Sequence, residues 1–268
     1  MTKSGSLVVV GSGIKFPSHM TTEAQLCIER ADKLFFLTSS EAAEQWLVER
    51  NAAGESLDRF YAKGKRRIDT YLEMVAHVLT AVYAGNHVCV LFYGHPGIFV
   101  WPSHELIRQA RAAGFPTVML PGISAEDCLF ADLGIDPARE GCQSYEATDF
   151  LVRNRQIDTS AGLVLWQVGV VGNLTPPTPG AVPSLPLLKN ALLLLYDPTH
   201  LVYIYEAAQV QNQASTVQCV ALADLNETLV TAVSTLYIPP AQPAQINLDM
   251  LQKLGLSIDD IQFSETSG

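Results

Sequence analysis

A buried strand followed at once by a tight loop constrains this chain most. Residues 88–91 read Val-Cys-Val-Leu, an apolar run typical of a strand that is covered on both faces. The sequence Tyr-Gly-His-Pro-Gly at 93–97 then requires a sharp turn. Because open α/β sheets bind ligands beyond the carboxyl ends of their strands, Tyr93 and His95 stand where a site is expected. From these residues alone, a site and a plain turn are equally good interpretations.

Strand-like and helix-like segments alternate along the first half of the chain. Short apolar runs predict strands, and apolar residues at helical spacing predict helices between them. We expect strands at 7–10, 33–37, 88–93 and 117–120, and helices that start at Thr21 or Thr22, at residue 71 and at residue 103. Such alternation is typical of an α/β layer with a mainly parallel sheet.

The chain divides into three parts on this basis. Pro121-Gly122 interrupts the alternation and is a candidate boundary. We expect an N-terminal α/β domain at 1–120, a C-terminal α/β domain at 121–240 and a short helical tail at 241–268. Within the tail, residues 248–254 have the pattern of a short amphipathic helix.

Charge and composition narrow the classes of function. A formal net charge of −10 disfavours a nucleic-acid binder, which needs Lys and Arg for phosphate contacts. Five widely spaced cysteines without a C-x-x-C pair indicate reduced thiols in a cytoplasmic protein. No apolar run reaches the length of a membrane span, and no set of His, Cys and carboxylate residues has metal spacing. We therefore expect no nucleic acid, membrane or metal ion as a partner.

Short motifs near the expected strand ends have structural interpretations. Gly11 and Gly13 follow the first apolar run, but the third glycine and the acidic residue of a dinucleotide fingerprint are missing. Ser124 lacks the second flanking glycine of a nucleophile elbow. Acidic residues at 126 and 127 favour Ser124 as the N-cap of a helix instead.

A basic cluster, Lys63-Gly64-Lys65-Arg66-Arg67, precedes the helix expected at 71–83. As a bare motif it is typical of a solvated loop. Arg67 and Tyr71 are four residues apart, however, so they share one helix face if the helix begins early enough. A guanidinium and a phenol on one face hold a developing oxyanion and manage its proton. Tyr61 lies close enough upstream to join them.

Several motifs, taken in order, resemble the tetrapyrrole methylase family over about residues 6–240. They are Val9-Val10-Gly11-Ser12-Gly13, Thr21-Thr22-x-Ala24, Ala31-Asp32, Tyr93-Gly94-His95-Pro96 and Pro121-Gly122-Ile123-Ser124. The resemblance implies a two-domain α/β methyltransferase with a parallel or mixed sheet in each domain and S-adenosylmethionine in the interdomain cleft. The chain departs from the family where Gly-Pro-Gly reads Gly-Ser-Gly at 11–13 and Gly-Asp-Pro reads Gly-His-Pro at 94–96.

These departures match a narrower group, the borosin peptide backbone α-N-methyltransferases. The stretches at 93–100, 120–134, 141–149 and 167–172 are similar to that group. The resemblance implies iterative methylation of backbone amide nitrogens in a ribosomally made precursor peptide, by a homodimer. Many relatives carry the precursor as a C-terminal extension. Because this chain ends soon after Pro240, we expect a split form whose precursor peptide is a separate partner.

The same resemblance implies roles for particular residues. Arg67 and Tyr71 match the family's catalytic Arg-x-x-x-Tyr pair, and Tyr93 matches its third catalytic residue. Tyr61 matches a further active-site tyrosine. The cofactor contacts carry over to Tyr93, His95, Ile98, Ser124, Ala125, Gln167, Ala207, Ser234 and Thr235. Apart from the family, His95 is interpreted as a loop-stabilising residue, and Trp101 as either a channel lining or a packed rim aromatic.

Amide methylation needs assistance because the nitrogen lone pair is delocalised into the carbonyl. We expect Arg67 to hold an imidate-like oxygen, and Tyr71 or Tyr61 to take the proton, with a pKa lowered by neighbouring basic groups. One alternative is a methyltransferase for a tetrapyrrole, corrinoid or other small substrate, which the Gly-His-Pro variant and the Arg67–Tyr71 pair disfavour. The other is a non-catalytic peptide-binding scaffold, which the presence of every candidate catalytic residue disfavours.

Overall fold

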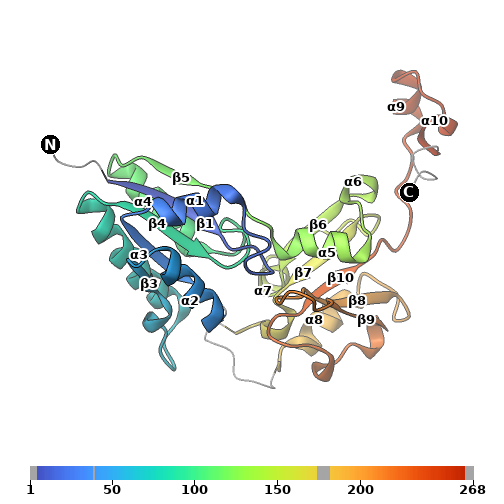
Figure 1. Ribbon diagram of the computed structural model, residues 1–268. Helices are drawn as coiled ribbons and strands as arrows, with labels where there is room; N and C mark the ends of the chain where they lie inside the picture. The colour runs from blue at the N-terminus through green and yellow to red at the C-terminus, as the bar shows by residue number, and fades with distance from the viewer. Residues whose placement is uncertain (1–4, 39, 174–181, 263–268) are drawn as a thin grey trace. The chain divides into compact units, whose positions relative to one another are not determined.

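The computed structural model describes residues 5–38, 40–173 and 182–262 (Figure 1). These residues form two compact units. Unit 1 contains the chain up to 133 together with 173 and 207–216, and unit 2 contains 134–172, 182–206 and 217–262. Unit 1 therefore continues past residue 121. Because a compact unit is not by itself an independently folding domain, the three-part division of the chain stays a prediction.

Unit 1 is built on a five-stranded parallel sheet in the order β3-β2-β4-β1-β5. Its strands are β1 (Ser6–Gly11), β2 (Lys33–Leu37), β3 (Gly54–Ser56), β4 (His87–Phe92) and β5 (Thr117–Met119). Its helices are α1 (Thr22–Arg30), α2 (Glu41–Arg50), the 3-10 helix η1 (Asp58–Phe60), α3 (Arg67–Tyr83), α4 (Trp101–Ala112) and α5 (Ala125–Leu133). The predicted alternation of strands and helices is confirmed in this unit.

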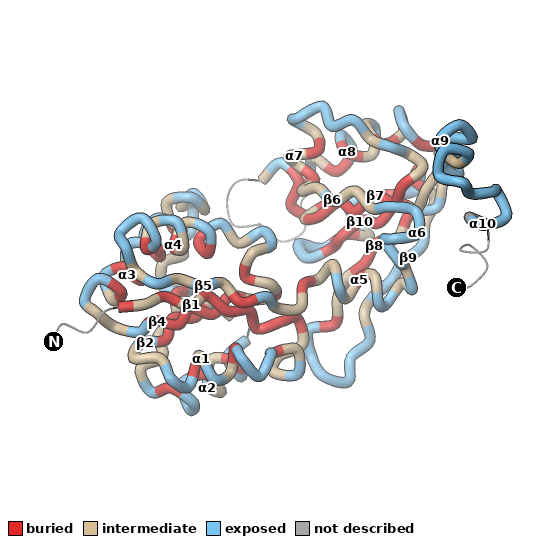
Figure 2. The backbone as a smooth tube through the Cα atoms, turned by 90° about the horizontal axis from the view of Figure 1, so that it is seen from above, coloured by how far each residue is buried: buried red, intermediate tan, exposed pale blue. Residues whose placement is uncertain are grey.

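Successive side chains along a strand point to opposite faces of the sheet, so unit 1 has a separate core on each face. On β4, Val88, Val90 and Phe92 pack with α3 and α4. Cys89 and Leu91 pack with α1 and α2 on the opposite face. Figure 2 shows the buried strands lying between these two pairs of helices. Because both faces are covered, β4 needs the continuous apolar run that marks it in the sequence.

Unit 2 is built on a five-stranded mixed sheet in the order β6-β7-β10-β8-β9. Strand β7 pairs in parallel with β6 and antiparallel with β10, which is antiparallel to β8. The strands are β6 (Cys142–Glu146), β7 (Gly162–Trp166), β8 (Leu201–Glu206), β9 (Thr216–Ala221) and β10 (Thr235–Ile238). The helical segments are α6 (Pro137–Glu140), α7 (Ala147–Val152), η2 (Val168–Val170), α8 (Leu185–Leu192), η3 (Leu222–Asp224) and η4 (Glu227–Leu229).

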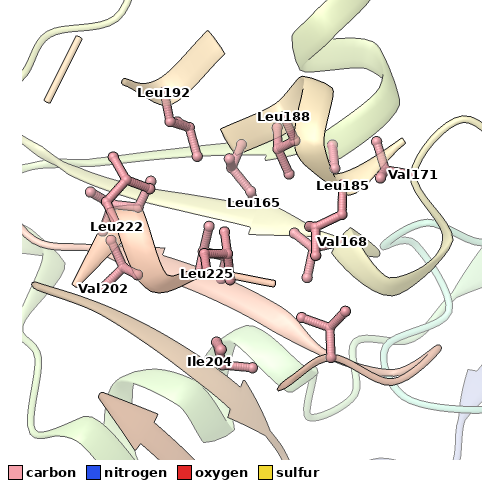
Figure 3. Packing of buried hydrophobic residues seen from close by; sticks show 14 of the residues in the cluster. Leu165, Val168, Val171, Leu185, Leu188, Leu192, Val202, Ile204, Leu222 and Leu225 are labelled. Atoms are coloured by element: carbon pink, nitrogen blue, oxygen red, sulfur yellow. The ribbon is translucent and has the colours of Figure 1, made fainter. Parts of the chain in front are cut away.

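The core of unit 2 lies between α8 and the sheet. Leu185, Leu188 and Leu192 follow helical spacing along one face of α8 and are buried. Figure 3 shows these side chains directed toward Leu165 and Val168, within one apolar cluster. The expectation of parallel and mixed sheets is therefore confirmed by one sheet of each kind.

The tail after β10 carries two short helices, α9 (Leu248–Lys253) and α10 (Ile258–Gln262). The helix predicted at 248–254 is confirmed, although no residue of α9 is buried. Among the described residues, no helix combines the length and apolar character that crossing a membrane requires.

Candidate active site

Close backbone contacts line the carboxyl edge of the unit 1 sheet. Gly13 N–H donates to Gly94 O at 3.2 Å, and Gly94 N–H donates to Gly13 O at 3.1 Å. A Cβ atom on Gly11 would lie 2.1 Å from Gly94 O, and one on Gly122 would lie 3.2 Å from it. The loops after β1, β4 and β5 therefore pack backbone against backbone, which requires a residue without a Cβ atom at Gly11.

The loop after β4 is held in one conformation by its own hydrogen bonds. His95 Nδ1 accepts the N–H of Gly97 at 2.9 Å, and Ile98 N–H donates to His95 O at 3.2 Å. The loop-stabilising interpretation of His95 is confirmed. In the neutral imidazole, Nε2 then carries the proton. Phe99, with φ +54°, adds a left-handed residue of the kind that concentrates at functional sites.

Ser124 closes the N-terminus of α5, as its motif predicts. Its Oγ accepts Asp127 N–H at 3.2 Å and donates to Asp127 Oδ2 at 2.7 Å. The same carboxylate oxygen accepts the Ser124 N–H at 2.7 Å. The helix cap is thereby satisfied reciprocally. The role of Ser124 and Ala125 as cofactor contacts stays a prediction.

The structure brings Tyr61, Arg67 and Tyr71 together within unit 1. Helix α3 begins at Arg67, so the condition for Arg67 and Tyr71 to share a face is met. The Tyr61 hydroxyl is hydrogen-bonded to Tyr71, and the Arg67 guanidinium acts electrostatically on Tyr61. The Tyr71 ring stacks on Trp101, with 6.3 Å between ring centroids and 17° between the planes. We call Tyr61, Arg67 and Tyr71 the Tyr–Arg–Tyr group.

Tyr61 and Tyr93 are neutral phenols near neutral pH, because the pKa of each is raised. Burial is the largest cause that raises the pKa of Tyr61; the neighbouring Tyr71 adds to the rise, and Arg67 opposes it less strongly. Burial also raises the pKa of Tyr93 to about 12, with a smaller contribution from Cys128 on α5. The expectation that basic groups lower the pKa of Tyr61 is therefore wrong, because desolvation of the phenolate outweighs the attraction of Arg67.

Tyr93 should ionise late in an alkaline titration. Its pKa is raised from 10 to about 12, so its contribution to folding is complete below pH 10 and is lost as the pH rises through about 12. Ultraviolet difference absorbance of the wild type and Tyr93→Phe should differ by one phenolate that forms near pH 12. A difference centred on pH 10 would contradict the burial of this phenol.

Arg66 and Lys65, two further cations of the basic cluster, bind nearby groups. The exposed Arg66 holds both carboxylate oxygens of Asp69 at 2.8 Å, as the solvated-loop interpretation predicts. Lys65 differs, because only 22% of its side chain is exposed. Its Nζ donates to Phe60 O at 3.0 Å and to Glu73 Oε2 at 2.6 Å. Lys65 therefore connects the loop that carries Tyr61 to helix α3.

The remaining predicted contacts lie at strand ends, and Gln167, Ser234 and Thr235 belong to unit 2. Gln167 follows β7 with φ +60°, a left-handed conformation that is unfavourable for a residue with a Cβ atom. Ser234 Oγ donates to Glu206 Oε1 at 2.5 Å. Sequence reasoning missed Glu206, although an acidic residue that ends the apolar strand β8, directly before Ala207, was a usable signal.

Within the part of the chain that the structure describes, no group of three or more His, Cys, Asp or Glu side chains is arranged to hold a metal ion. The candidate site offers a guanidinium, phenols and backbone hydrogen-bonding groups.

Comparison with solved structures defines the class of fold. Uroporphyrin-III-C-methyltransferase from Thermus thermophilus matches 94% of this chain and 96% of its own, with a TM-score of 0.61 at 18% identity. The methyltransferase CobJ matches 91% of this chain and 98% of its own, with a TM-score of 0.57 at 14% identity. The predicted tetrapyrrole-methylase-like fold is confirmed.

Sequence comparisons then define the family. The family model described as Tetrapyrrole (Corrin/Porphyrin) Methylases matches residues 6–221, and the chain belongs to this family of S-adenosylmethionine-dependent methyltransferases.

Three fungal relatives carry names that combine a methyltransferase with a ribosomally synthesized peptide precursor. The type I borosin cyclic peptide precursor of Coprinopsis marcescibilis is 40% identical over 95% of this chain and 68% of its own. The dendrothelin A precursor of Dendrothele bispora is 42% identical over 94% and 62%, and the omphalotin A precursor of Omphalotus olearius is 40% identical over 95% and 62%. The chain thus spans about two thirds of the length of these relatives.

Proposed function

We propose that this methyltransferase acts on backbone amide nitrogens of a ribosomally made precursor peptide, supplied as a separate chain, and methylates several of them in succession. The Tyr–Arg–Tyr group is the observation that carries the proposal. Its guanidinium and its hydrogen-bonded phenols are suited to a peptide carbonyl and the adjacent N–H. The identity of about 40% to methyltransferases fused to peptide precursors supports a peptide as the substrate.

The residues of unit 1 fit S-adenosylmethionine at the carboxyl edge of the sheet. The glycines at 11 and 122 let the loops after β1, β4 and β5 approach one another closely through backbone, and His95 and Ser124 lie in two of these loops. In this proposal Tyr93, His95, Ile98, Ser124 and Ala125 bind the cofactor, with Gln167, Ala207, Ser234 and Thr235 as further contacts. The bound cofactor supplies an electrophilic methyl group, which replaces the amide proton on nitrogen and leaves a neutral thioether.

The Tyr–Arg–Tyr group acts on the amide. Arg67 binds the carbonyl oxygen and stabilises the negative charge that develops there as nitrogen becomes nucleophilic. Tyr61 stays protonated because burial raises its pKa, and it donates to the Tyr71 oxygen. Tyr71 relays the amide proton: its oxygen accepts that proton as its own hydroxyl proton passes to solvent. Trp101 fixes the plane of the Tyr71 ring. We also propose that the enzyme works as a homodimer in complex with its precursor.

Tandem mass spectrometry tests the proposed reaction directly. Purified residues 1–268 are incubated with S-adenosylmethionine and the small protein encoded beside the gene, and fragment ions locate each added methyl group. We expect mass gains in steps of one methyl group on backbone nitrogens. Samples that lack the cofactor are the control.

The other outcomes separate the remaining candidates. Methyl groups on side chains only would overturn amide methylation. Turnover of a tetrapyrrole or corrinoid instead would establish the second candidate, which the fold shared with uroporphyrin-III-C-methyltransferase favours. Cofactor binding in a titration, without transfer to any of these substrates, would favour a non-catalytic peptide-binding scaffold.

A further inference from the structure

We infer that Lys65 is a positioning residue, which holds Tyr61 against Tyr71 and Arg67 in the working geometry of the site. The inference rests on the proposed function for its effect on the reaction. Its structural basis is the pair of hydrogen bonds from Lys65 Nζ, to the carbonyl of Phe60 at 3.0 Å and to the carboxylate of Glu73 at 2.6 Å.

The first bond acts on the peptide unit next to Tyr61. Phe60 O belongs to the peptide group that joins residues 60 and 61, so a cation bound to this oxygen fixes the plane from which the Tyr61 side chain starts. Tyr61 N–H also donates to Asp58 O at 3.0 Å, at the end of η1. The chain therefore enters the site through a constrained peptide unit.

The second bond anchors the loop to the helix that carries the other two members of the group. Glu73 lies on α3, two residues beyond Tyr71. The Lys65 N–H donates to Ala62 O at 3.1 Å, which closes a turn within the loop. Lys65 thus joins the Tyr61 loop to α3 by a path that is separate from the Tyr61–Tyr71 hydrogen bond.

Partial burial of Lys65 distinguishes the Lys65–Glu73 ion pair from an ordinary surface ion pair. Exposed pairs between long side chains contribute little, because water screens them and their ordering costs entropy. Here 22% of the Lys65 side chain is exposed, against 54% for Glu73, and the ammonium also binds a backbone carbonyl. Removal of the lysine would leave the Phe60 carbonyl without this donor, so the loop would be expected to move.

Kinetics of four variants test the inference in the full chain. We expect Lys65→Met to lower kcat by about tenfold to a hundredfold, because displacement of a reacting group by about 1 Å has effects of that size. The KM for the peptide and the affinity for S-adenosylmethionine should stay within about twofold, as expected for a change confined to the reacting geometry. Lys65→Arg should restore most of the rate. Lys63→Met, in the same loop and exposed, is the matched control and should behave as wild type.

Glu73→Gln separates positioning from simple electrostatics. This variant keeps the lysine charge near Tyr61 but removes the charged acceptor that anchors it. If Lys65 acts by position, Glu73→Gln should also lower kcat, though less than Lys65→Met. A rate that falls in Lys65→Met but is unchanged or raised in Glu73→Gln would mean that charge alone matters, and would overturn the inference.

Hydrogen–deuterium exchange gives a readout that needs no turnover. In Lys65→Met, the amides of Tyr61 and residue 65, which are hydrogen-bonded within the loop, should exchange faster, while the amides of α3 at 75–82 should not change. Tyr61 should also ionise at a lower pH than in the wild type, because its phenol loses burial. Unchanged exchange would overturn the inference.

These readouts keep the two proposals distinguishable. If the wild type transfers no methyl group to any peptide, the proposed function fails, and faster exchange with earlier Tyr61 ionisation in Lys65→Met still supports Lys65 as the residue that positions Tyr61. If the wild type is active and Lys65→Met exchanges faster but turns over normally, the proposed function stands and the positioning role is overturned.

Discussion

Arg67→Ala should lower the rate of peptide methylation by about 10²–10³-fold, the size of effect found when one charge-stabilising donor is removed from an active site. Arg67 is the first residue of α3. Its guanidinium acts electrostatically on Tyr61, whose hydroxyl is hydrogen-bonded to Tyr71. Without the guanidinium, no cation of this group is left to hold the carbonyl oxygen while charge develops on it. The loss should appear in kcat and in kcat/KM alike, because the interaction strengthens in the transition state.

The matched control for this prediction is Arg66→Ala. Arg66 precedes Arg67 directly and has the same side chain, but 71% of it is exposed and it pairs with Asp69. This variant should methylate the peptide at close to the wild-type rate. Titration calorimetry should give wild-type affinity for S-adenosylmethionine in both variants. Wild-type turnover in Arg67→Ala, with the protein folded and the cofactor bound, would remove Arg67 from the mechanism.

Gly11→Ala should destabilise unit 1 and weaken cofactor binding. The added Cβ atom would lie 2.1 Å from Gly94 O and 2.8 Å from Pro96 Cδ, so the ends of β1 and β4 must separate. Insertion of one methyl group into a filled site costs about 1–3 kcal/mol, and more where backbone must move, so we expect ~3 kcal/mol. Thermal unfolding should show a fall in Tm of roughly 2–4 °C for each kcal/mol, and titration should show weaker binding of S-adenosylmethionine.

Gly122→Ala supplies the graded control at the same edge. Its Cβ atom would lie 3.2 Å from Gly94 O, a distance that a shift of a few tenths of an ångström relieves. Its effect on Tm and on cofactor affinity should therefore be clearly smaller than that of Gly11→Ala. Equal effects of the two substitutions would show that the approach of Gly11 to Gly94 is not the tight contact described here.

The hydrophobic pattern of the sequence predicted those elements whose structure depends on burial alone. Strand β4 could be predicted because both of its faces are covered, so every residue from Val88 to Phe92 is apolar. The start of α3 could not be predicted from pattern, because the basic residues before it look like a loop. Arg66 pairs with Asp69 in the first turn, a contact that requires the helix to exist already. Helix α4 begins at Trp101 because Pro102 favours the first turn of a helix.

The sequence predicted which residues of the Tyr–Arg–Tyr group come together better than it predicted their pKa shifts. Spacing placed Arg67 and Tyr71 on one face, and the position of Tyr61 just upstream, together with the family resemblance, added Tyr61. The direction of the Tyr61 pKa shift was predicted wrongly, because the sequence shows the nearby cations but not the burial of the phenol. Glu206 was missed because its partners, Thr231 and Ser234, lie far away in the sequence and reach its carboxylate only in the folded chain.

The stacking of Tyr71 on Trp101 gives the site its own optical reporter. The chain has three tryptophans, and the other two lie in different surroundings. Trp46 packs under Arg50 and against Phe16, and Trp166 is buried in the sheet of unit 2. Trp101 is 39% exposed beside a candidate catalytic ring. Intrinsic fluorescence should therefore change when a ligand occupies the Tyr–Arg–Tyr group, and Trp101→Phe should remove that change.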